Sequence, residues 1–212
     1  MLGIEADNVT YNVYRNGSKL TASPIANSTN YIDTAGNATA TYSVAAVVGG
    51  VEQPLSSASA VWAQQYLTVK LQRPAGGTTP DGVAYDYSPN DVSVGDVDGD
   101  GSYELFVKWD PSNSKDNSQS GYTGNVFVDA YRLDGTRLWR VDLGRNIRAG
   151  AHYTQFIVYD LDGDGKAELA MKTGDGTIDG AGTVIGTATA DHRNSTGSVS
   201  YTHLTLPTKR IV

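Results

Sequence analysis

Two short acidic segments constrain the fold of this chain more than any other feature. Residues 96–104 read DVDGDGSYE and residues 160–168 read DLDGDGKAE, so the second segment repeats the first at a distance of 64 positions. The flanks repeat too, with VSVG and FIVY before the segments and LFVK and LAMK after them. Apolar stretches around a glycine-rich turn are typical of paired strands. A repeated unit of strand, acidic loop and strand predicts a β-propeller or a related radial array.

The spacing of the carboxylates within each segment predicts a calcium loop. Three aspartates alternate with two glycines, which tolerate the positive φ of a tight loop, and a glutamate follows at the ninth position. Carboxylates at positions 1, 3, 5 and 9 and the main-chain carbonyl at position 7 give an oxygen-only shell, which suits Ca²⁺. The predicted ligands are Asp96, Asp98, Asp100, Ser102 and Glu104 in the first loop, and Asp160, Asp162, Asp164, Lys166 and Glu168 in the second.

Two alternatives qualify this assignment. An EF-hand places its last glutamate at position 12 between helices, whereas here it stands at position 9 between strands, as in the calcium loops of integrin-type propellers. A single acidic turn could equally be a solvated connection, but two copies with intact spacing favour calcium. The ion would have a structural role or contact the substrate directly, and the first is favoured because unneutralised carboxylates so close together repel one another.

The distribution of charge excludes several classes of function. The chain has 23 acidic and 16 basic residues among 212, and the two loops hold eight of the acids. The other 15 acids nearly balance the bases, so the net charge of −7 comes mainly from the loops. An acidic chain is a poor partner for nucleic acid. No apolar run approaches the roughly 20 residues of a membrane-spanning helix, and the lack of cysteine excludes disulfides and thiol catalysis.

The first 62 residues predict a small β-sandwich. Alternating residues 9–14 are followed by the hairpin turn Asn16-Gly17, and a second strand over 41–48 is followed by Gly49-Gly50. Such a sandwich needs two earlier strands, so we expect Met1 to be an internal methionine. The Pro- and Gly-rich stretch 72–82 marks the domain boundary. Beyond it, Asp134-Gly135 predicts a hairpin between strands 126–133 and 138–143.

Two polar segments offer candidate binding residues. Residues 108–125 carry many amide and hydroxyl groups between two aromatic residues, which suits a sugar ring, although an ordinary inter-strand insertion would look the same. Residues 143–155 concentrate Arg145, Arg148 and His152. Arginine pairs well with carboxylates, so this is the best local site for an anionic ligand. His152 could act as an acid, a base or a metal ligand, or simply be a hydrogen-bonded structural residue.

Four of these motifs together resemble one enzyme family. They are YNVYRNG at 11–17, NDVSVGDVDGDG at 90–101, KWDPSNSKDNSQ at 108–119 and RNIRAGAHYTQ at 145–155. In this order, and over about residues 4–195, they resemble the bacterial rhamnogalacturonan lyases of polysaccharide lyase family 11. The resemblance implies a fibronectin-III-like β domain followed by a calcium-binding propeller, normally of eight blades. Members of the family are roughly three times as long as this chain.

The resulting fold prediction is all-β. We expect a partial fibronectin-III-like domain over 1–65 and about two propeller blades over 66–197, truncated at both ends. Residues 198–212 do not share the glycine- and aspartate-rich composition of the preceding segment. They resemble translated sequencing-adapter read-through, so we expect a non-native tail.

The resemblance also implies an activity. The family cleaves the rhamnose–galacturonate backbone of pectin, rhamnogalacturonan I, by calcium-dependent β-elimination, and its members are secreted. Asn90 and Asp110 match positions that line the family's cleft and are predicted to bind substrate, whereas Arg148 and His152 are further catalytic candidates. We expect a monomer that contacts neither nucleic acid nor membrane and is inactive at this length. The alternative is a non-catalytic, calcium-dependent carbohydrate-binding or adhesion propeller, but the motifs at 108–119 and 145–155 favour the lyase.

Overall fold

The structure is a computed structural model that describes residues 8–116 and 118–193, and these residues form strands and loops without a helix. The predicted all-β class is therefore confirmed. No segment of these residues has the length and helical apolar character to cross a bilayer. The expected tail over 198–212 lies outside the described residues. The chain divides into two compact units, Met1–Thr68 and Val69–Val212, which we describe separately.

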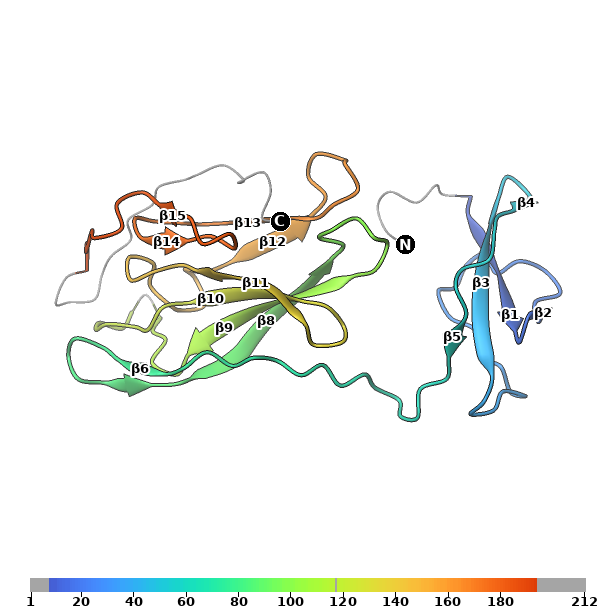
Figure 1. Cartoon of the computed structure of the whole chain (residues 1–212), viewed down its shortest axis with the longest axis horizontal. Helices are drawn as coiled ribbons and strands as arrows, with labels where there is room; N and C mark the ends of the chain where they lie inside the picture. The colour runs from blue at the N-terminus through green and yellow to red at the C-terminus, as the bar shows by residue number, and fades with distance from the viewer. Residues whose placement is uncertain (1–7, 117, 194–212) are drawn as a thin grey trace. The chain divides into compact units, whose positions relative to one another are not determined.

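The N-terminal unit contains a five-stranded antiparallel sheet in the order β2-β1-β3-β4, with β5 also paired to β3 (Figure 1). The strands are β1 (Thr10–Arg15), β2 (Ser18–Lys19), β3 (Thr41–Val48), β4 (Val51–Glu52) and β5 (Ser59–Ala60). The predicted Asn16-Gly17 hairpin is confirmed: both residues have positive φ, 49° and 80°, as a two-residue primed turn requires. One face of the sheet, carrying Tyr11, Val13 and Val44, borders an open cavity of about 820 Å³.

The C-terminal unit is built on a six-stranded sheet in the order β15-β14-β11-β10-β9-β8. Its strands are β8 (Tyr87–Gly95), β9 (Glu104–Pro111), β10 (Phe127–Tyr131), β11 (Arg137–Asp142), β14 (Thr177–Ile178) and β15 (Val184–Ile185). Two further pairs are β6 (Gly77–Thr78) with β7 (Ala84–Tyr85), and β12 (Phe156–Tyr159) with β13 (Glu168–Met171). Strands β8 to β11 follow one another along the chain as an antiparallel meander (Figure 1). The predicted hairpin at Asp134-Gly135 joins β10 to β11, with φ of 88° at the glycine.

The hairpin β12–β13 packs closely against the meander through Gly95 at the end of β8. A Cβ atom there would lie 2.6 Å from the Cβ of Ala167 and 2.7 Å from a methyl of Val158, so only glycine fits. The amide of Ala167 donates to the carbonyl of Asp96 at 2.6 Å. The two acidic loops are therefore neighbours, each at the tip of its own hairpin.

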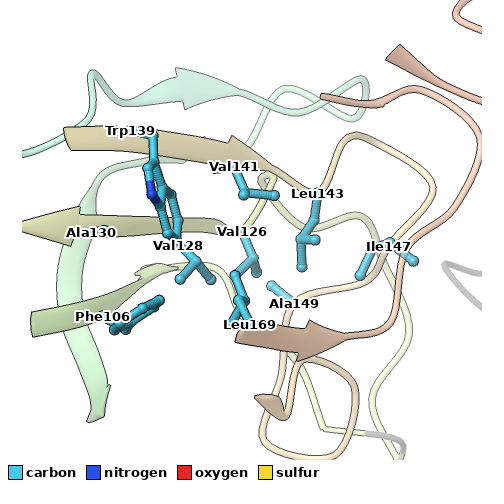
Figure 2. Close-up of a cluster of buried hydrophobic side chains, with 10 residues drawn as sticks. All are labelled: Phe106, Val126, Val128, Ala130, Trp139, Val141, Leu143, Ile147, Ala149 and Leu169. Atoms are coloured by element: carbon cyan, nitrogen blue, oxygen red, sulfur yellow. The ribbon is translucent and has the colours of Figure 1, made fainter. Parts of the chain in front are cut away.

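The core lies between the meander and the second hairpin. Figure 2 shows apolar side chains from β9, β10, β11 and β13 meeting in one cluster, joined by Ile147 and Ala149 from the loop after β11. These two residues anchor the polar segment 143–155 to the core. A second cluster surrounds Trp109 and Tyr131. There the buried carboxylate of Asp129 accepts hydrogen bonds from Trp109 Nε1 (2.8 Å) and the Tyr131 hydroxyl (2.6 Å) and pairs with Arg140, so a charge inside the sheet is fully compensated.

Candidate metal centres and the polar end of the hairpins

The first acidic loop is held in a tight turn by its own main chain. Asp96 accepts the amides of Gly99 (2.6 Å), Asp100 (3.2 Å) and Gly101 (2.8 Å). Glu104 reaches back across the turn, where its Oε2 accepts the amide of Val97 at 2.9 Å. Both glycines have positive φ, 78° and 85°. The loop therefore orients its carboxylates before any ion arrives.

The second loop repeats this geometry. Asp160 accepts the amides of Gly163, Asp164 and Gly165 at 2.7, 3.1 and 3.0 Å, and Glu168 accepts the amide of Leu161 at 2.8 Å. The two glycines have φ of 76° and 89°. Because each bond has its counterpart 64 positions earlier, the turn is a property of the nine-residue motif.

Carboxylate oxygens converge in both loops. Oxygens of Asp96, Asp98 and Glu104 lie within 4.8 Å of one another, and so do those of Asp160, Asp162 and Glu168. The fifth-position carboxylates, Asp100 and Asp164, instead accept the amides of Ser102 and Lys166 at 2.7 and 3.0 Å. The geometry thus gathers positions 1, 3 and 9, and the ligand roles of all five positions stay predictions.

The electrostatics of the first loop fit a divalent cation. Glu104 is 1% exposed, and burial, together with the charges of Asp98, Asp100 and Asp96, raises the pKa of its carboxyl although the Val97 amide acts in the opposite direction. A buried carboxylate among three others is costly unless positive charge is supplied. Arg132 supplies part of it, donating to Asp98 at 2.9 Å, and this bond lowers the pKa of Asp98. The all-oxygen donor set matches Ca²⁺.

The two predicted substrate-binding residues lie at the opposite end of the same hairpin. Asp110 is near the end of β9, opposite Ser88, and accepts a hydrogen bond from the Ser114 hydroxyl at 2.7 Å. Asn90 is exposed at an irregularity in β8, where the pairing register shifts between Pro89 and Val92. A bulge of this kind re-aims side chains at a sheet edge. The binding roles of Asn90 and Asp110 stay predictions.

The same irregularity contains an ion pair that the sequence did not indicate. Lys108, only 3% exposed, forms a salt bridge with Asp91, whose side chain is 63% exposed. Lys108 lies on β9 opposite the bulge, so a buried ammonium finds a carboxylate at the strand surface. No spacing signal identifies such a pair, because it depends on the register shift.

Arg148 and His152 are brought together by the loop after β11 but have local partners. Arg148 donates to the main-chain carbonyls of Asp116, at 3.4 Å, and Gln119. His152 Nδ1 lies 3.1 Å from a carboxylate oxygen of Asp116. Arg145 is 3.9 Å from Asp191. The contacts of Arg148 and His152 tie the segment 143–155 to the segment after β9, and the catalytic roles suggested for these two residues stay predictions.

Comparison with known proteins identifies the family. Residues 66–205 match the rhamnogalacturonan lyase family 11 C-terminal domain, and residues 1–62 match the rhamnogalacturonan I lyase beta-sheet domain. The chain is 67% identical over 198 residues to the rhamnogalacturonan endolyase YesW and 60% identical to the exolyase YesX, both of Bacillus subtilis strain 168. Each match covers 93% of this chain and 32% of the relative.

A solved structure agrees with these matches. The crystal structure of YesW superposes with a TM-score of 0.82, at 67% identity, over 94% of this chain and 34% of that one. The rhamnogalacturonan lyase PL11 of Bacillus licheniformis superposes equally well at 64% identity, over 95% of this chain and 34% of that one. The chain thus spans about a third of the length of these relatives. Its sequence, its fold and both domain matches agree, and the chain belongs to the rhamnogalacturonan lyases of polysaccharide lyase family 11.

Proposed function

We propose that this chain forms part of a secreted enzyme that cleaves the rhamnose–galacturonate backbone of pectin by β-elimination. The observation that carries the proposal is 67% identity, over nearly the whole chain, to a protein named as a rhamnogalacturonan endolyase. The meander β8–β11 would be one propeller blade and the hairpin β12–β13 the start of the next, because β12 contacts β8 from a separate sheet and blades repeat around a central axis. The N-terminal sheet would belong to a fibronectin-III-like domain.

The reaction determines what the residues must do. A base removes the proton on C5 of galacturonate, the C4–O bond breaks, and an unsaturated uronide remains. Asn90 and Asp110 would hold hydroxyl groups of the sugar by hydrogen bonds, since both carry polar groups at one end of the β8–β9 hairpin. Positioning of this kind aligns the C5 proton with its base.

Calcium in the two loops would have a structural role. Gly95 pairs with Glu104 at the loop end of the hairpin, whereas Ser88 pairs with Asp110 at the other end. Asp110 lies six positions after Glu104 along β9, which corresponds to about 20 Å. An ion in the first loop is too far away to touch a sugar held by Asp110. When bound, calcium would neutralise the loop carboxylates and fix the ends of the paired strands.

A chimera tests the proposed activity. Residues 4–195 replace the matching segment of YesW, and absorbance of the unsaturated uronide is followed with rhamnogalacturonan I as substrate. We expect cleavage by the chimera, a loss of about 10- to 100-fold in kcat/KM on Asp110→Ala, and no cleavage by the 212-residue chain alone. A chimera that folds and binds the polysaccharide in calcium without cleaving it would instead support the alternative of a carbohydrate-binding module.

A further inference from the structure

Lys172 differs from Arg148, His152 and Lys108 in the kind of partner that its charge contacts. It directly follows β13, and its Nζ lies 5.7 Å from the ring centroid of Tyr153. The side chain is half-buried, and burial lowers the pKa of its ammonium. Within residues 8–116 and 118–193, no carboxylate lies within salt-bridge distance of it.

Three other cations of this region have local partners. Arg148 donates to two main-chain carbonyls, His152 pairs with Asp116, and Lys108 pairs with Asp91. The guanidinium of Arg148 also lies 5.7 Å from the centroid of the Tyr153 ring. Two cations thus contact one aromatic ring. A ring holds an ammonium in place but carries no net charge, so Tyr153 does not neutralise Lys172.

Lys172 lies at the end of its hairpin that corresponds to the end carrying Asp110 in the first hairpin. Lys172 is the repeat equivalent of Lys108, two residues before Asp110, and the hairpins that carry these lysines pack side by side. The connection is also direct. Ser114 donates to Asp110, and the next amide, that of Lys115, donates to the carbonyl of Ala149 at 3.1 Å, beside Arg148. Both acidic loops lie at the other end of their hairpins.

We propose that Lys172, held against Tyr153, binds the carboxylate of a uronic acid residue of the polysaccharide. The inference rests on the proposed function and adds the residue that recognises the acid. An ammonium is a point charge that accepts a carboxylate from several directions, which suits a polymer with one acid in each disaccharide. The bound carboxylate also offsets the unfavourable desolvation of the Lys172 ammonium, and this makes the free energy of binding more favourable.

Kinetics of the chimera test the inference. Lys172→Met keeps the apolar stem and removes the charge. We expect it to raise KM for rhamnogalacturonan about 10-fold, with kcat within about twofold, because charge-assisted hydrogen bonds to substrate are lost in the ground and transition states alike. Lys172→Arg should restore most of the affinity. The matched control is Lys70→Met, which removes an exposed lysine and should leave both constants unchanged.

The other possible results distinguish failure of the Lys172 inference from failure of the proposed function. An unchanged KM in Lys172→Met, or a fall in kcat at constant KM, overturns the inference while leaving the lyase proposal intact. A chimera that does not cleave with Lys172 present contradicts the proposed function instead. In that case calorimetry of the 212-residue chain with galacturonate decides, with galactose as the neutral control. Binding of galacturonate that Lys172→Met abolishes supports the subsite, and its absence overturns it.

Discussion

The two repeats, residues 92–108 and 156–172, share a turn but differ in their surroundings. Both loops have the same set of main-chain hydrogen bonds to their first aspartate and last glutamate. Glu104 is nevertheless fully buried, whereas Glu168 is half-buried, and β9 is twice as long as β13. Nine residues therefore determine the turn, while the packing around them determines the electrostatic cost of its carboxylates.

The last lysines of the repeats differ in the same way. Lys108 is enclosed by the long hairpin and neutralised by Asp91, and it has a structural role. Lys172 follows the short hairpin and contacts a ring instead of an acid. One position in the repeat thus serves stability in the first copy and, in our proposal, recognition in the second.

Removal of calcium should have the largest effect on both copies. At a calcium concentration of 1,000 times Kd, each filled site adds about 4 kcal/mol to the free energy of unfolding. We therefore expect chelation to lower the denaturation midpoint of the chain strongly, measured by urea unfolding with calcium or with a chelator. Magnesium should not substitute, because it demands a smaller octahedral shell.

Matched variants separate the two loops. Glu104→Gln and Glu168→Gln each remove one charged ligand, and each should abolish about half of the stabilisation by calcium. With chelator present their effects should diverge, because Glu104→Gln relieves a buried charge and raises the midpoint whereas Glu168→Gln does not. Identical behaviour of both variants in chelator would contradict the difference between the loops.

Removing the carboxylate beside Lys108 and removing the charge of Lys172 should have different effects on the free energy of unfolding. Asp91→Asn leaves the buried Lys108 ammonium without this carboxylate and should cost about 1–3 kcal/mol, because Asp91 itself is 63% exposed. Lys172→Met removes a half-buried charge that pairs with no carboxylate in the part of the chain that the structure describes, so the free energy of unfolding should stay constant or rise. Urea unfolding of both variants beside the parent checks this. Destabilisation by Lys172→Met to the same extent as by Asp91→Asn would assign both lysines to structure.

The stability difference between the parent and Lys172→Met should depend on pH. Burial lowers the pKa of Lys172 in the folded chain below its ordinary value of 10.5. Between the folded pKa and 10.5 the unfolded chain binds more protons, so the parent gains stability with rising pH in that interval. The penalty relieved by Lys172→Met is thus greatest below the folded pKa. The melting temperatures of the parent and Lys172→Met should converge as the pH rises from 7 to 10.5. A difference that stays constant over this range would show that Lys172 is fully solvated.

The sequence predicts local turns well and long-range partners poorly. Asn16-Gly17, Asp134-Gly135 and the two acidic loops follow from their own residues, and each adopts the expected positive φ. The salt bridge of Lys108 depends on a register shift in a neighbouring strand, and the contacts of Arg148 go to main-chain carbonyls that no sequence pattern displays. No sequence pattern distinguishes Lys172 either. Only folding shows that it is half-buried beside Tyr153 and forms no salt bridge with any of the described residues.

The smallest expected effect concerns Arg132, which contacts the first loop. Its guanidinium is 49% exposed and donates to Asp98, one of the three converging carboxylates. Arg132 and calcium compete for the carboxylate of Asp98, but an exposed ion pair contributes only about 0.2–1 kcal/mol to stability. Arg132→Met should therefore tighten calcium binding by the first loop about two- to fivefold, measured by titration of the Glu168→Gln background, where the second loop is disabled. The same substitution in Glu104→Gln should leave the second loop unchanged. Weaker binding by the first loop would mean that Arg132 supports the turn rather than competing with the ion.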